Sequence, residues 1–141
     1  MKLNMLIMVA AAGLALAGCN KAESPAEVRH DVTDARADAQ RDVADARADA
    51  REDMADAQKD MADAQANRDG DDVADAAQDA SETAAKGQYK VAVAQAEATH
   101  KVAIEKCEAM SGSAQKDCKD RADADLDAAK RQAEMRRDGT G

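Results

Sequence analysis

The 141-residue sequence has no Phe or Trp and a single Tyr, so it almost lacks the large side chains that usually fill a protein core. Alanine supplies most of the apolar content. Because alanine buries little area, a conventional single-domain core is hard to build from this composition. Alanine is also the best helix former, so we expect an all-α fold of long helices joined along thin seams. Disorder is the competing interpretation of so polar a chain.

Basic residues are fewer than acidic ones. The chain has 20 Lys and Arg against 29 Asp and Glu, a formal net charge of −9. Without residues 1–18, which include Lys2, the counts become 19 and 29 and the net charge −10. Such a surface repels nucleic acid and anionic headgroups, so we expect no nucleic-acid partner and favour basic or cationic partners.

The chain also lacks a hydrophobic run long enough to cross a membrane. The run from Met5 to Ala17 is apolar apart from Gly13, but a transmembrane helix needs about 20 such residues. Lys2 precedes this run and small residues follow it, which is the layout of an export signal. We therefore predict a signal peptide over residues 1–18.

Leu16-Ala17-Gly18-Cys19 resembles the lipobox of bacterial lipoproteins. In that family the peptide is cleaved before the cysteine, here between Gly18 and Cys19. The cysteine receives diacylglycerol and usually an N-acyl chain such as palmitate. The resemblance implies a lipid-anchored protein of the cell envelope, with residues 19–23 as a lipidated tether. Asn20 stands where an Asp would resemble the inner-membrane retention signal, which favours the outer membrane facing the periplasm. The alternative is a secreted protein with an unmodified Cys19.

Residues 24–69 are predicted to form one helix with eleven-residue repeats. Ser24-Pro25-Ala26-Glu27 is a capping box with proline at the first helical position. From Asp31 the unit DVTDARADAQR recurs as DVADARADARE, then as a shortened and a full-length copy to residue 70. Eleven residues make three turns, a period that favours a nearly straight or right-handed supercoil. One narrow stripe contains Val32, Ala35, Ala39, Val43, Ala46, Ala50, Met54, Ala57 and Met61.

Opposite charges flank this stripe. Arg36 and Arg47 lie on one side, and Asp42 and Asp53 on the other. In a parallel pair of identical helices, each flank meets the opposite flank of its partner, so Arg meets Asp. The pattern predicts a coiled-coil-like parallel homo-oligomer. The alternative is a single solvated helix.

The second half is predicted to be a connecting helix over 70–88, with breaks at Gly70 and Gly87, followed by an antiparallel helical hairpin over 89–137 and a disordered tail over 138–141. Ser111-Gly112-Ser113 marks the hairpin turn, with Gly112 as a C-terminal cap and Ser113 as the next N-cap.

Two cysteines flank that turn. On one straight helix Cys107 and Cys118 would be about 16 Å apart, whereas a disulfide needs Cα atoms within about 7 Å. Folding back at the turn satisfies this limit, and an oxidising compartment favours the bond. We therefore predict a structural Cys107–Cys118 disulfide. A zinc site lacks the paired ligand spacing, and a reactive thiol lacks a nearby activating motif.

No catalytic constellation or metal site is predicted. His30 with Asp34 could form a loose metal site, but an exposed histidine is the simpler interpretation. His100 falls opposite Asp125 in the predicted hairpin, where it would form a local ion pair. Without a nucleophile motif, a phosphate loop or paired carboxylates in an apolar pocket, we expect neither an enzyme nor a small-molecule substrate.

A lipobox followed by alanine-rich seam helices resembles the Braun-type murein lipoproteins, whose anchored helices trimerise in parallel. That family attaches to peptidoglycan through a C-terminal lysine, whereas this chain ends Arg136-Arg137-Asp138-Gly139-Thr140-Gly141. The resemblance implies a self-associating envelope spacer whose partners include other envelope proteins, with lipid on Cys19 and no other cofactor. The repeats also resemble late-embryogenesis-abundant proteins. This second resemblance implies an acidic stress-protective lipoprotein, or one that binds cations or basic partners, partly disordered until bound.

Overall fold

The computed structural model describes residues 21–67 and 70–139, and within these ranges the chain is helical with no strand. Its helices are α1 (Pro25–Asn67), α2 (Gly70–Cys107) and α3 (Gly112–Asp138). The all-α prediction is therefore confirmed. Asp138, expected in a disordered tail, is the last residue of α3. The predicted signal peptide, Gly18 and Cys19 lie outside the described residues.

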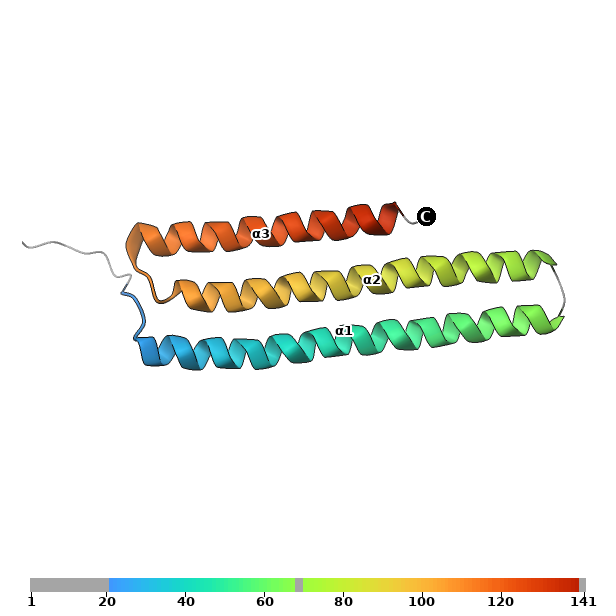
Figure 1. Ribbon diagram of the computed structural model, residues 1–141, viewed down its shortest axis with the longest axis horizontal. Coiled ribbons are helices and arrows are strands. Elements are labelled where there is room, and N and C mark those ends of the chain that lie inside the picture. The colour runs from blue at the N-terminus through green and yellow to red at the C-terminus, as the bar shows by residue number, and fades with distance from the viewer. Residues whose placement is uncertain (1–20, 68–69, 140–141) are drawn as a thin grey trace, which may run out of the picture.

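The three helices form a flat row with α2 in the middle (Figure 1). Each helix runs antiparallel to its neighbour. In the part of the chain that the structure describes, α2 packs against both α1 and α3, whereas the backbones of α1 and α3 do not pack against each other. The molecule is therefore an elongated single layer whose two broad faces are both open.

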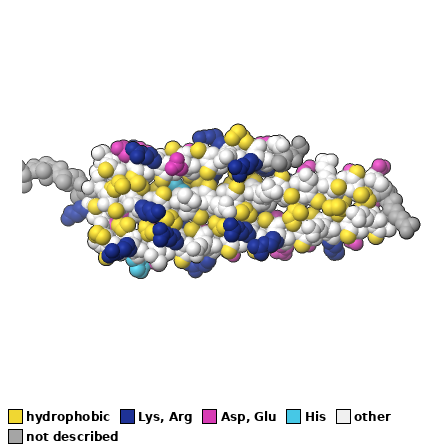
Figure 2. Space-filling model, viewed as in Figure 1, with side chains coloured by type: hydrophobic (Ala, Val, Ile, Leu, Met, Phe, Trp, Pro, Cys, Tyr) yellow, Lys and Arg dark blue, Asp and Glu magenta, His cyan; other side chains and the backbone are white. Residues whose placement is uncertain are grey.

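The stripe predicted on α1 is the packing face of that helix. Val28, Val32, Ala35 and Ala39 are buried, and the stripe residues from Val43 to Met61 are half-buried. The stripe packs against α2 of the same chain. Since α1 ends at Asn67 and α2 begins at Gly70, so short a connection favours an antiparallel neighbour. On the face drawn in Figure 2, hydrophobic side chains follow the junction of α1 and α2.

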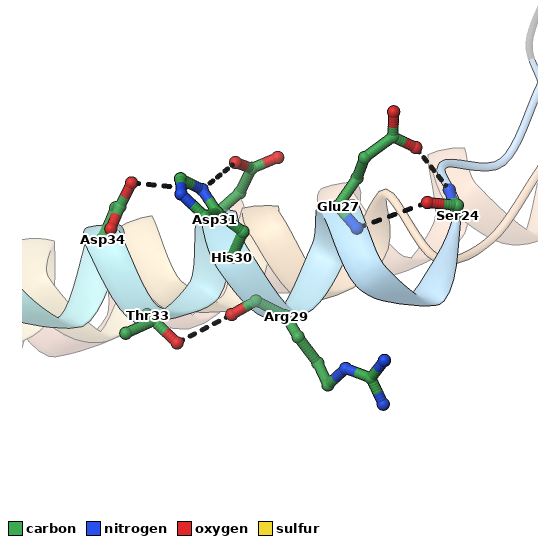
Figure 3. Close-up of polar contacts among 7 residues, drawn as sticks. All are labelled: Ser24, Glu27, Arg29, His30, Asp31, Thr33 and Asp34. Carbon is green, nitrogen blue, oxygen red and sulfur yellow. Dashed lines mark hydrogen bonds and ion pairs between the residues drawn. The ribbon is translucent and has the colours of Figure 1, made fainter.

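The capping box at the start of α1 forms as the sequence predicts (Figure 3). The Ser24 backbone N–H donates to Glu27 Oε2 at 2.9 Å, and the Glu27 N–H donates to Ser24 Oγ at 3.3 Å. These bonds to Ser24 hold the pKa of the Glu27 carboxyl below its usual value. Two backbone donors of the first turn are thereby satisfied, which fixes where α1 begins.

The expected break at Gly87 does not occur, and α2 runs through this residue from Gly70 to Cys107. Gly87 is buried against α1, where an added Cβ would lie 3.1 Å from Ala50 Cβ. A glycine in a helix costs about 1 kcal/mol relative to alanine. Here the missing side chain lets the two helices approach closely. The predicted connecting helix and the first arm of the predicted hairpin are therefore one helix.

The turn between α2 and α3 lies where the sequence predicts it, with different roles for its residues. Gly112 has φ +62° and is the first residue of α3 rather than a cap of α2. Ser111, not Ser113, occupies the N-cap position, with extended backbone angles. The left-handed conformation favours a residue without Cβ, and this requirement places Gly112 at the corner.

Candidate functional site

The proposed lipid site, Cys19, lies outside the described residues, but the segment that follows it is attached to the rest of the molecule. The Glu23 N–H donates to the carbonyl oxygen of Glu108 at 2.9 Å. Glu108 lies in the turn between α2 and α3, so this bond joins the start of the chain to that turn. The end of the row at which the described chain begins therefore holds both the beginning of α1 and the α2–α3 turn (Figure 1).

The two carboxylates Glu108 and Glu23 at this end differ in their polar partners. Glu108 forms an ion pair with Lys119 and accepts a hydrogen bond from Gln115 Nε2 at 2.5 Å. Glu23 Oε2 is shielded from solvent and has no hydrogen-bond partner among the described residues. Loss of solvation raises the pKa of Glu23, and the negative charges of Asp31 and Glu108 raise it further. The ionised form of Glu23 is thus disfavoured in the folded chain.

Cys107 and Cys118 lie at disulfide distance, with Cα atoms 5.7 Å apart. Cys107 is 1% exposed. The sequence predicted this pairing, and the turn at Gly112 brings the two residues together. The bond closes the α2–α3 turn at the same end of the row as Glu23.

Polar pairs farther along join α2 and α3. His100 Nε2 lies 2.6 Å from Asp123 Oδ1, not next to Asp125 as expected. Two residues correspond to about 200° around a helix, so Asp125 lies on another flank of α3. Lys130 Nζ lies 2.7 Å from Glu97 Oε1, and this hydrogen bond raises the pKa of Lys130. His100 therefore lies beside a carboxylate of α3, but that carboxylate is Asp123 and not the expected Asp125.

His30 is 74% exposed, and its Nδ1 lies 3.3 Å from both Asp31 Oδ1 and Asp34 Oδ2 (Figure 3). In residues 21–67 and 70–139, no three or more His, Cys, Asp or Glu side chains lie close enough together to hold a metal ion. No described helix is long and apolar enough to cross a membrane either.

One flank of the α1–α2 seam is bridged by ion pairs. Lys90 Nζ lies 2.9 Å from Asp53 Oδ2, and this hydrogen bond and the charge of Asp53 raise the pKa of Lys90. Lys101 Nζ lies 3.6 Å from Asp42 Oδ2 and 3.8 Å from Asp38 Oδ2. The Asp flank that was expected to face a second chain is therefore paired with lysines of α2.

A hollow of about 830 Å³, which includes the Lys90–Asp53 pair in its lining, lies toward the end of the row far from Glu23, and we call it the acidic hollow. Gln78 and Lys86 lower the pKa of Glu82 on its border through hydrogen bonds. The carboxylates that line it are Asp53, Asp56, Asp60, Asp72, Asp75, Asp79 and Glu82.

The other flank of the seam is a continuous groove. It consists of two hollows of about 690 and 750 Å³ that share Arg47 and Gln95. Among the described residues no Asp or Glu lines either hollow. On the face drawn in Figure 2, Lys and Arg side chains lie beside the hydrophobic line over α1 and α2. We call this feature the basic groove; its cationic border consists of Arg36, Arg47, Arg51, Lys106 and Arg136.

The sequence predicted part of the basic groove. Arg36 and Arg47 were assigned to one flank of the stripe, which is where they lie. The opposite wall of the basic groove belongs to α2, which supplies neutral residues such as Gln95 and Thr99 there. No repeat signal on α1 specifies that wall, because it depends on the antiparallel return of the chain.

Comparison with known proteins adds no relative. No family model matches the chain. No curated protein matches it, and no solved structure does.

Proposed function

We propose that this chain is a non-catalytic, lipid-anchored spacer of the bacterial cell envelope, held to the outer membrane by diacylglycerol and an N-acyl chain on Cys19. The observation that supports this best is the order of features along the chain. A lipobox-like motif is followed, six residues after Cys19, by the capped start of a 43-residue helix. At 1.5 Å per residue, α1 extends about 65 Å from the anchor.

The structure suits a spacer in a second respect. The Glu23–Glu108 hydrogen bond and the Cys107–Cys118 pair both lie at the end next to the anchor. The tether is therefore short, and the helical row begins close to the membrane surface. Two acyl chains make such anchoring stable, because each buried CH₂ contributes about 0.8 kcal/mol.

Metabolic labelling with palmitate and membrane fractionation test the anchor. We expect the wild-type chain to carry label and to sediment with outer membranes. Cys19→Ser should lose the label, remain incompletely processed and lose membrane attachment. Cys118→Ser is the matched control, since it also removes a cysteine but should keep label and membrane attachment. An unlabelled wild type, found in the same soluble fraction as Cys19→Ser, would contradict the proposal.

Self-association in parallel belongs to the same proposal, through a surface other than the buried stripe. The outer edge of α1 exposes Ala44 and Ala48, with Arg51, which also borders the basic groove, on one flank and Asp45 on the other. A parallel pair of these edges would bring opposite flanks together, and chains anchored at one end are already parallel. Sedimentation of the soluble chain should show an oligomer that grows with concentration; a monomer throughout would exclude this part.

The acidic hollow favours a second candidate function, the binding of cations or of a basic partner under stress. Seven carboxylates and three cations, Lys86, Lys90 and Arg137, border this hollow, and the remaining excess of negative charge would favour a positive ligand. Circular dichroism with and without calcium separates the two candidates. A spacer is helical and stable without calcium, whereas the second candidate gains helix only when calcium is added or the sample is dried.

A further inference from the structure

The basic groove has a charge opposite to that of the whole chain. The net charge is −9, yet Arg36, Arg47, Arg51 and Lys106 lie along this groove. Within residues 21–67 and 70–139 none of these four side chains forms an ion pair. The lysines on the opposite flank, Lys90 and Lys101, are paired with aspartates. These four cations are therefore available to an outside ligand.

The floor of the groove is apolar and open to solvent. Val43 and Val102 contribute to one hollow, and Met54 and Val91 to the other; all four are half-buried. Between them lie small half-buried residues such as Ala50 and Ala92, which add no bulk to the floor. An exposed apolar floor with a charged border marks an interaction surface.

The groove has the dimensions of a helix site. From Arg36 to Gln58 it follows α1 for about 33 Å, which corresponds to about six turns of an α-helix. Arg36 and Arg47 are about 16 Å apart along the axis, and Arg47 and Arg51 about 6 Å. A docked helix with carboxylates at the same intervals would meet all three arginines.

We propose that the basic groove binds an amphipathic helix of another protein, one with an apolar stripe flanked by Asp and Glu. The stripe would lie on the floor formed by α1 and α2, and the carboxylates against Arg36, Arg47 and Arg51. This is the helix-in-groove mode of recognition, in which apolar residues supply burial and flanking charges set orientation. The site gives the chain a specific acidic partner, which a spacer does not require.

Other occupants fit less well. A second copy would have to insert the Asp flank of α1, but Asp38, Asp42 and Asp53 are already paired with lysines of α2. That flank also brings carboxylates rather than apolar side chains to an apolar floor, which is costly. A bilayer surface is too flat to reach a floor that lies between two helices. A separate amphipathic helix supplies both the apolar stripe and the acidic border.

The test uses the full mature chain with Cys19→Ser, which keeps it soluble and makes the result independent of the lipid anchor. The probe is a synthetic 24-residue helical peptide with a Leu/Ala stripe and Glu at the intervals of the three arginines. A peptide with Lys in place of each Glu is its control. Binding is measured by fluorescence anisotropy at several salt concentrations.

The matched variants separate the groove from net charge. The groove triple removes three charges at the border of the basic groove and consists of Arg36→Gln, Arg47→Gln and Arg51→Gln. The control triple removes three exposed charges outside the groove and consists of Lys59→Gln, Arg121→Gln and Arg131→Gln. We expect the groove triple to weaken binding of the acidic peptide about tenfold or more and the control triple less than about twofold. The Lys peptide should not bind.

Circular dichroism shows whether both triples remain folded, which these exposed positions allow. Equal weakening by the two triples would overturn the proposal in favour of non-specific charge. Binding of phosphatidylglycerol vesicles without binding of the acidic peptide would replace the partner helix with a membrane. An oligomer that only the groove triple dissociates, together with no peptide binding, would replace it with a second copy.

Discussion

Removal of the Cys107–Cys118 bond is expected to release α3 while α1 and α2 stay together. In the described structure α3 packs against α2 alone, whereas α2 also packs along α1. The bond closes a sequence separation of 11 residues. For so short a loop, the chain-entropy model gives about 3 kcal/mol of stabilisation.

That magnitude decides which part opens first. The residues that α3 buries are Gln115, Ala122 and Ala133. A buried methyl group is worth about 0.8 kcal/mol, so the two alanines contribute roughly 2 kcal/mol. The ion pairs of α3 with α2 are partly exposed, and each adds at most about 1 kcal/mol. The disulfide therefore contributes at least as much as the two buried alanines or any one ion pair of α3, and its loss should lower the opening free energy of α3 first.

Hydrogen exchange of the backbone amides measures this directly. Since each 1.4 kcal/mol is a factor of ten, we expect protection in α3 to fall about a hundredfold in the reduced chain and protection in α1 to change little. Cys107→Ala with Cys118→Ala should show the same pattern and no response to reductant. Equal loss in α1 and α3 would refute the reasoning, as would unchanged protection in α3. Non-reducing peptide mapping must also find the bond within one chain.

Three other substitutions test local features. Ser24→Ala removes the capping box and should cost about 1 kcal/mol in denaturant unfolding; unchanged stability would mean that the box contributes nothing. Gly87→Leu should cost about 1–3 kcal/mol because it crowds Ala50, whereas Gly70→Leu, which meets open space, should not crowd a neighbour. Glu23→Gln should raise stability at neutral pH. Because folding raises the pKa of Glu23, its ionised form carries a penalty above the folded-state pKa, and the benefit of the substitution should vanish below about pH 4.5. A benefit that persists in acid would contradict this.

The sequence predicted the local features of the fold well, because each depends on a few neighbouring residues. The capping box at Ser24 needs only its own turn of helix, and the paired cysteines need only the break near Gly112. The stripe on α1 was also predicted, since periodicity specifies which face of a helix is buried. Periodicity does not specify which helix packs on that face. A thin alanine seam accepts a parallel copy or an antiparallel neighbour, and the connection from Asn67 to Gly70 selects the neighbour.

The residues that were misplaced depend on contacts across the row. Gly87 indicated a break on helix propensity alone, but its proximity to Ala50 makes glycine the residue that fits there. His100 was matched to Asp125 by counting back from the cysteines. The flank on which a carboxylate lies depends on its angle around α3 as well as its height, and the angle selects Asp123.

Charge shows most clearly why composition and structure predict different partners. A net charge of −9 favours cationic partners when it is averaged over the surface. The flat row separates the charges instead, because the eleven-residue repeat returns Asp and Arg to opposite flanks of α1. Lysines of α2 lie beside the Asp flank, and neutral residues such as Gln95 lie beside the Arg flank. Cationic partners therefore suit the acidic hollow. At the basic groove, a docked acidic helix lies closer to the arginines than the Debye length of about 8 Å, so salt screens this attraction little. The more distant negative charges of the chain lie beyond that length, and salt screens their repulsion.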